Sequence, residues 1–173
     1  YVLGLHSGGH LFWEQGSGGQ SERLTLALPM TARQWYLVAV NLDLDAGTVA
    51  LRQIPANPLL AVDSHAQASG RLAAVDPAAL ASLPLTMGAA ATGKPFPRYA
   101  RHYNGRLDSP TLLPYAAGDA DLAQLRVEAP ARRHAAPPLA AWDFSQSIDS
   151  DVIVDAARPW SEGRIENLPA RGV

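Results

Sequence analysis

The stretch QWYLVAVNLDLDAGTVALRQI, residues 34–54, decides the fold. Two segments rich in β-branched and apolar residues flank the turn sequence from Asp45 to Gly47, so we expect a β-hairpin. Between residues 35 and 42 the apolar side chains fall on both faces of the first segment, which predicts an interior strand. A hairpin of this kind indicates an antiparallel sheet.

Short segments of the same kind recur on both sides of the hairpin, with Gly, Ser, Pro and Asp clustered between them. Two short helices interrupt the pattern. One is expected at 76–83, where Asp76 is placed as N-cap before Pro77, and one at 118–128, with acids in its first turn. The rest of 55–83 is expected to be a long loop. The pattern predicts an all-β fold of two antiparallel sheets packed face to face. The further expected strands lie at 1–6, 10–15, 23–28, 85–90, 103–113, 139–146, 151–156 and 163–169.

The composition limits the classes of protein that need consideration. The chain has 173 residues with 47% hydrophobic residues, which suits a single domain over 1–173. A formal net charge of −2 with scattered arginines argues against a nucleic-acid partner, and no apolar run reaches the roughly 20 residues of a membrane span. The chain has no cysteine, which fits a cytoplasmic bacterial protein. Because the chain opens at Tyr1 inside a strand-like segment and ends at NLPARGV without a helix stop or polar tail, we expect a domain excised from a longer chain.

None of the common catalytic patterns is complete in this sequence. Glycoside hydrolysis needs two carboxylates across a cleft, and no strand carries a suitably spaced pair. The segment around Ser17 lacks the first glycine of the nucleophile elbow, since Gln15 occupies that position. The loop from Gly88 to Pro95 resembles a phosphate-binding loop but ends in proline where a hydroxyl is required. We therefore expect no catalytic residue in this chain.

Metal binding has two weak candidate sets. His6 and His10 are four residues apart, but the glycine pair between them predicts a turn rather than a shared helix face. Asp43 and Asp45 alternate as in some calcium loops, although the longer ligand pattern of a calcium loop is absent. The hairpin turn explains both acids without a metal ion.

Sugar binding is the other function that a β-sandwich commonly supports. Exposed aromatic rings stack on sugar faces, which makes Trp13, Tyr99 and Trp160 the candidates for such contacts. The aromatic content of 7% favours instead that these rings pack in the core.

Three segments resemble laminin-G-like, concanavalin A-like sandwiches. NGRLDSPTLL (104–113), followed by the helix DADLAQL (119–125), is similar to their closing strand, and residues 32–51 are similar to their central hairpin. Residues 140–173, beginning AAWDFSQ, look like their opening strand, so the order is circularly permuted. The resemblance implies a two-sheet jelly-roll sandwich of the lectin and glucanase type.

The permuted order, with Trp-Asp-Phe-Ser and Asn-Leu-Pro-x-Arg near the end, resembles the large-subunit family of N,N-dimethylformamidase. The resemblance covers nearly the whole chain and is specific from about Tyr103 onward. It implies a parent amide hydrolase whose iron is held by tyrosines and a glutamate in a separate domain. Tyr36, Tyr99, Tyr103 and Tyr115 match no iron motif of that family, so no cofactor is expected in this segment.

The resemblance also implies roles for four residues. Asp108 would cap a strand crossover and accept loop N–H groups, and Asp155 matches the sandwich pattern. Trp142 and Phe144 would face the core from a strand at 139–145, which should pair antiparallel with 106–113.

Two functions then compete. The first is a non-catalytic accessory domain that binds the catalytic domain of the parent chain or a neighbouring subunit. The alternative is a carbohydrate-binding, lectin-like module, because the fold alone does not decide between them.

Overall fold

A computed structural model describes residues 1–17, 20–57, 59, 65–72, 84–92, 98–126, 134–158 and 160–166. The chain divides into two compact units, Tyr1–Asn104 and Gly105–Val173. The regular secondary structure of the described residues is mostly β-strand in antiparallel sheets, with one short helix, so the predicted all-β class is confirmed. The jelly-roll arrangement and the single domain over 1–173 concern how the two units are combined, and they stay predictions.

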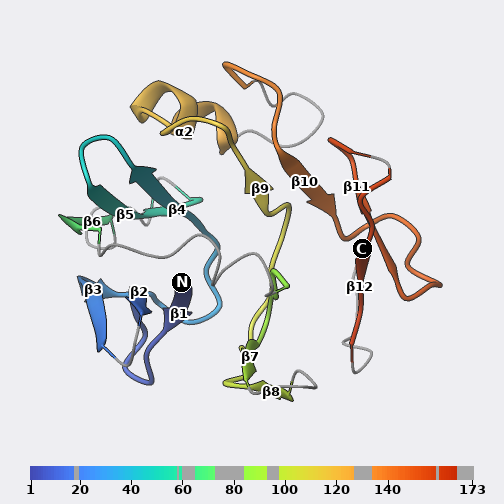
Figure 1. Ribbon diagram of the computed structural model, residues 1–173, viewed down its shortest axis with the longest axis horizontal. Helices are drawn as coiled ribbons and strands as arrows, with labels where there is room; N and C mark the ends of the chain where they lie inside the picture. The colour runs from blue at the N-terminus through green and yellow to red at the C-terminus, as the bar shows by residue number, and fades with distance from the viewer. Residues whose placement is uncertain are drawn as a thin grey trace. The chain divides into compact units, whose positions relative to one another are not determined.

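The first sheet of unit 1 contains β1 (Val2–Leu5), β2 (His10–Ser17) and β3 (Gln20–Pro29), in that order (Figure 1). The β1–β2 turn needs a glycine, because Gly9 has a φ of 82° and donates its N–H to the His6 carbonyl oxygen. The two histidines therefore flank a turn, as the sequence predicted.

The second sheet of unit 1 contains β4 (Tyr36–Asp43), β5 (Thr48–Pro55) and β6 (Ala66–Arg71). The predicted hairpin is confirmed, with Val40 opposite Leu51 in the ladder. Two details of the prediction are wrong among the described strands. The central strand is β5 rather than β4, and β6 lies within the segment that was expected to be loop. The expected helix at 76–83 lies outside the described residues.

The core of unit 1 lies between these two sheets (Figure 1). Alternate residues of β5 are buried, since every second side chain of a strand points to the same face. Trp13 and Leu26 of the first sheet pack against Val49 and Leu51 of the second. At roughly 1.5–3 kcal/mol for each large apolar side chain, this burial is the main term that holds the sheets together.

Two further strands, β7 (Ala90–Thr92) and β8 (Arg98–Ala100), form a small antiparallel ladder in unit 1. The expected strand at 85–90 thus has only its last residue in a strand. The near match to a phosphate-binding loop begins here, and its residues 93–95 lie outside the described residues.

Unit 2 contains a sheet in the order β12 (Gly163–Arg164), β11 (Val152–Asp155), β10 (Ala140–Asp143) and β9 (Thr111–Leu112). The expected pairing of 139–145 with 106–113 is confirmed, because Ala140 is opposite Leu112. The helix α2 (Asp119–Leu125) lies in the connection between these strands, as the sequence predicted. Asp121 in its first turn accepts the Gly118 N–H at 3.0 Å. None of the helices in the described ranges is long and apolar enough to cross a membrane.

Candidate binding surfaces

An apolar row runs along the edge strand β1 of unit 1. Leu3 lies opposite Trp13 and Leu5 lies opposite Leu11, so the two leucines share the face that carries the core residues of β2. Tyr1 lies on the same face, and its ring stacks on Trp13 with the centroids 5.0 Å apart. We call Tyr1, Leu3 and Leu5 the β1 row. Their exposed fractions are 45%, 46% and 38%.

The β1 row is exposed because the second sheet covers only the neighbouring strands. The core cluster takes Leu11 and Trp13 from β2 and Leu26 from β3, and it takes no residue from β1. The apolar face of the first sheet therefore extends beyond the core. Unit 1 thus presents an exposed apolar surface that borders its buried core.

On the opposite face of the first sheet, the side chains pack against one another. Phe12 is buried there, with the Arg23 guanidinium 4.4 Å from its ring centroid. The guanidinium also donates to the Glu14 carboxylate. A Cβ built on Gly4 would lie 2.5 Å from the Phe12 ring, so a side chain at this position would displace the ring. This face is therefore less suited to contact with a partner.

The second sheet of unit 1 presents a more polar outer face. The core-facing residues of β5 alternate with Ala50 and Arg52, which lie opposite Ser69 and Gln67 of β6. These four side chains line a shallow depression of about 300 Å³. Trp35 directly precedes β4, and the alternation of that strand places it on the same side as Ala39, which lies opposite Arg52.

Trp35 is half exposed, at 50%. It is therefore accessible enough to stack on a sugar ring, although its sequence context did not make it a candidate. Its position at the start of a strand in the sequence did not distinguish it from the core aromatic residues. Trp35 precedes β4 and takes no part in the core cluster, so its ring stays exposed.

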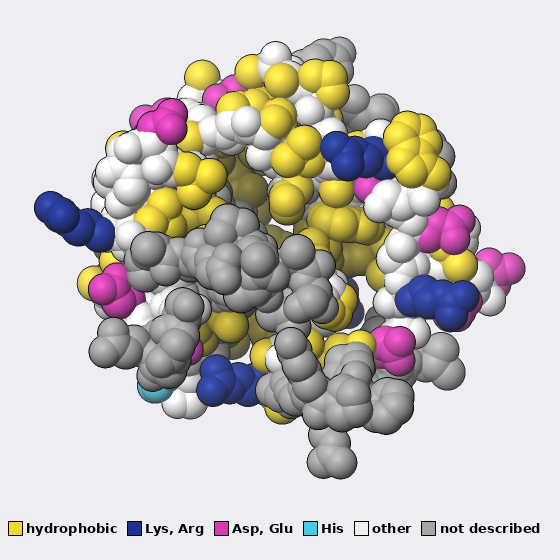
Figure 2. Space-filling view, in the orientation of Figure 1, with side chains coloured by type: hydrophobic (Ala, Val, Ile, Leu, Met, Phe, Trp, Pro, Cys, Tyr) yellow, Lys and Arg dark blue, Asp and Glu magenta, His cyan; other side chains and the backbone are white. Residues whose placement is uncertain are grey.

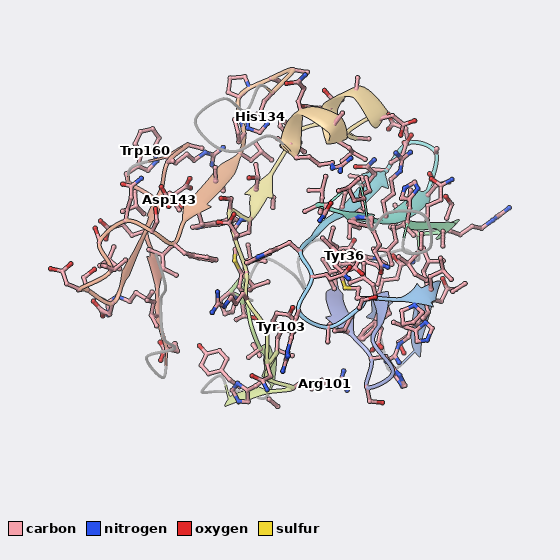
Figure 3. All side chains as sticks on the ribbon, turned by 180° about the vertical axis from the view of Figure 1, so that it is seen from behind. Tyr36, Arg101, Tyr103, His134, Asp143 and Trp160 are labelled. Carbon is pink, nitrogen blue, oxygen red and sulfur yellow. The ribbon has the colours of Figure 1, made fainter. Side chains whose placement is uncertain are left out.

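The three aromatic residues expected to stack on sugars differ in their surroundings. Trp13 is 8% exposed and donates its indole N–H to the buried Gln15 amide oxygen, so it is a core residue. Tyr99 lies on β8 and is partly buried. Trp160 is 82% exposed and projects from unit 2 (Figure 3). Of these three rings, Trp160 is therefore the most accessible.

The two acids considered for calcium lie in the β4–β5 hairpin. The Asp43 carboxylate accepts the Ala46 N–H at 2.9 Å, which closes the turn. Asp45 is exposed in that turn. Across the described parts of the chain, no three His, Asp or Glu side chains are grouped closely enough to hold a metal ion.

Two of the four tyrosines compared with the iron motif accept backbone N–H groups. The Tyr36 hydroxyl accepts the Thr31 N–H at 2.9 Å, and the Tyr115 hydroxyl accepts the Ala135 N–H at 3.0 Å. Each of these two phenols supports the backbone of its own unit (Figure 3 labels Tyr36).

The buried acid of unit 2 is Asp155 rather than Asp108. One oxygen of Asp155 accepts the N–H groups of Ala141, Ala157 and Arg158 at 2.9–3.2 Å, and the residue is 1% exposed. Asp108 is exposed and accepts the Ser109 hydroxyl. The acceptance of loop N–H groups that we expected of Asp108 thus occurs at Asp155. Asp108 precedes β9 in an irregular segment, where the described chain does not fold over it.

Trp142 and Phe144 are each partly buried. Trp142 lies on β10 opposite Asp155, whereas Phe144 follows the end of that strand. We had expected both rings to lie on one regular strand. The structure differs, because β10 ends at Asp143, before Phe144. The chain turns here because the Asp143 carboxylate accepts the Ser145 N–H and the Gln146 side-chain amide.

These hydrogen bonds also affect the acidity of Asp143 (Figure 3). The hydroxyl of Ser145 lies 2.6 Å from its carboxylate. This bond, followed by those from the Gln146 side chain and the Ser145 backbone, lowers the pKa of Asp143, while slight burial opposes the change. Asp143 therefore stays ionised to more acidic pH than an ordinary aspartate.

On the face in Figure 2, basic and acidic side chains occur singly or in small groups rather than as one field. This distribution agrees with the small formal net charge.

No protein-family model matches the chain, and no curated protein matches it either.

We predict that Asp155→Ala lowers the free energy of unfolding by at least about 2 kcal/mol, because three amide donors lose their acceptor. The matched change at the exposed acid, Asp108→Ala, should cost no more than about 0.5 kcal/mol. Urea unfolding of both variants, followed by circular dichroism, measures the two values. An equal cost at both positions would restore Asp108 as the structural acid.

The lowered pKa of Asp143 predicts a pH-dependent stability. A carboxyl group with a depressed pKa in the folded state stabilises the fold above its unfolded pKa of about 4, and this contribution is lost as the pH falls through the folded pKa. Asp143 is only partly buried, and solvent screening should keep the contribution at or below about 1 kcal/mol. Wild type should therefore be slightly more stable than Asp143→Asn at neutral pH, and the difference should vanish in acid. A difference independent of pH would contradict this assignment.

Proposed function

We propose that this chain is a non-catalytic accessory domain that binds another chain or domain of a larger, amidase-like protein. The observation that carries the proposal is the β1 row, in which three large apolar side chains are about half exposed beside a buried core. Exposed apolar side chains grouped in this way mark protein-binding surfaces more often than scattered ones do. Tyr1, stacked on Trp13, also supplies an aromatic anchor of the kind that dominates interface energies.

The resemblance to the N,N-dimethylformamidase large-subunit family supports the rest of the proposal. The parent would be a cytoplasmic amide hydrolase that holds iron in a separate catalytic domain. The partner of this chain would be that catalytic domain or a neighbouring subunit. The confirmed pairing of β9 with β10 supports the resemblance, since the permuted order requires these two strands to lie side by side.

The proposal predicts that Leu3→Lys weakens assembly of the full-length gene product by at least about tenfold, because a lysine in the row would be buried without a counter-charge. Native mass spectrometry of the assembled protein measures the effect, and Leu44→Lys in the exposed hairpin turn is the matched control. The isolated 173-residue chain should hydrolyse neither amides nor glycosides and should hold no stoichiometric iron. An unchanged assembly in Leu3→Lys, or amide turnover by the isolated chain with bound iron, would refute the proposal.

A second candidate is carbohydrate binding, favoured by the outer face of the second sheet. Trp35 offers an exposed ring at one end of this face, and Arg52, Gln67 and Ser69 offer hydrogen-bonding groups around a shallow depression. An aromatic platform beside a few polar groups suits the apolar face and the hydroxyl groups of a sugar ring. Arg52 lies opposite Ala39, which is four residues from Trp35, or about 13 Å along a strand. One sugar ring cannot span this distance, so the ligand would have to be a chain of sugar rings.

If this second function operates, Trp35→Ala should abolish oligosaccharide binding, because it removes the stacking platform. Trp160→Ala is the control, since it removes an exposed tryptophan from unit 2 instead. A glycan array followed by calorimetry on any ligand found would measure both variants. Binding that is lost in Trp160→Ala and kept in Trp35→Ala would move the site to unit 2.

A further inference from the structure

The outer edge of β1 carries backbone hydrogen-bonding groups that no described strand uses. The His6 N–H donates to the His10 carbonyl at 2.9 Å, and partners in an antiparallel ladder alternate between bonded and non-bonded pairs. Gly4 and Val2 therefore bond to β2. The N–H and C=O groups of Leu3 and Leu5 point to the other side. Among the described strands, only β2 pairs with β1.

This edge lacks the features that usually prevent strands from pairing between molecules. Val2–Leu5 has neither a charged residue nor a proline, whereas natural edge strands commonly use one or the other. The same two leucines whose backbone groups face outward also supply two side chains of the β1 row. Backbone and side chains therefore favour the same kind of partner, which is an uncharged, apolar strand.

We infer that β1 pairs antiparallel with β1 of a second copy of this chain. The inference rests on the proposed function, since it names the partner of the β1 row. Around a two-fold axis that passes beside Gly4, Leu3 of one copy lies opposite Leu5 of the other, and their outward N–H and C=O groups form a new ladder. The sheets β1–β2–β3 of the two copies then form one continuous sheet.

The second copy fits this edge because β1 is complementary to itself. A two-fold axis brings like residues close to one another, so a charged strand would repel its copy, and β1 has no charge. A two-fold axis perpendicular to the sheet also keeps both β1 rows on the same face. Each row then covers part of the apolar surface that the other leaves exposed.

The test is sedimentation equilibrium of the 173-residue chain over a series of concentrations. We expect a reversible dimer in wild type. Leu5→Pro should weaken it by at least about tenfold, because proline removes an outward N–H that the β1–β2 ladder does not use. Leu3→Lys should weaken it as well, because it sets like charges close together across the two-fold axis. Leu5→Ala keeps the N–H and is the matched control for the backbone contribution, and Leu44→Lys is the control for added charge.

Each outcome decides the inference. A chain that is monomeric at every concentration would overturn it, and a dimer that Leu5→Pro leaves unchanged would overturn the strand pairing. If Leu5→Pro does not fold, hydrogen exchange of wild type decides, because pairing requires the Leu3 and Leu5 amides to be protected more at high concentration. A monomeric chain whose Leu3→Lys variant still weakens assembly of the full-length gene product would overturn self-pairing alone and leave the accessory-domain proposal standing.

Discussion

The buried side chain of Gln15 determines how the two sheets of unit 1 are stacked. Its amide oxygen accepts the Trp13 indole N–H at 3.2 Å, and its amide nitrogen donates to the Arg71 carbonyl of β6 at 2.8 Å. The Trp13 bond lies within β2, so only the bond to Arg71 crosses between the sheets. A buried amide is costly without partners, so the stacking in which this bond forms is favoured over small displacements of one sheet on the other. Since the apolar contacts around it are not directional, this bridge supplies the specificity that they lack.

The two candidate surfaces of unit 1 follow from this stacking. With Trp13 held in the core, its stacking on Tyr1 orients the start of β1, and the row of Leu3 and Leu5 continues past the edge of the second sheet. The outer face of the second sheet is left to small and polar side chains around Arg52. One surface is apolar and lies at an edge, while the other is polar and lies on a face, so the two suit different chemical classes of partner.

The sequence predicted the fold best where a local signal and a pairing signal agree. The turn at Asp45–Gly47 and the acids in the first turn of α2 are local signals, and both elements formed as expected. The strand β6 was missed because Ala-Gln-Ala-Ser-Gly-Arg has little intrinsic preference for a strand and is a strand through its pairing with β5. Trp35 and Asp108 were misjudged for a related reason. Exposure of an aromatic ring and burial of an acid depend on which distant segments cover them, and spacing in the sequence does not report that.

The three backbone N–H groups bound to Asp155 affect which insertions and deletions the sheet of unit 2 can tolerate. One carboxylate oxygen binds the amide of Ala141 on β10 and two amides just after β11, so the two strands are aligned from one end. At the other end, Asp143 organises the first residues of the connection by itself. The register of the β10–β11 ladder therefore does not depend on the length of residues 147–151. Insertions and deletions should accumulate in this exposed connection across evolution without loss of the sheet, which makes it a natural place for new sequence to be acquired.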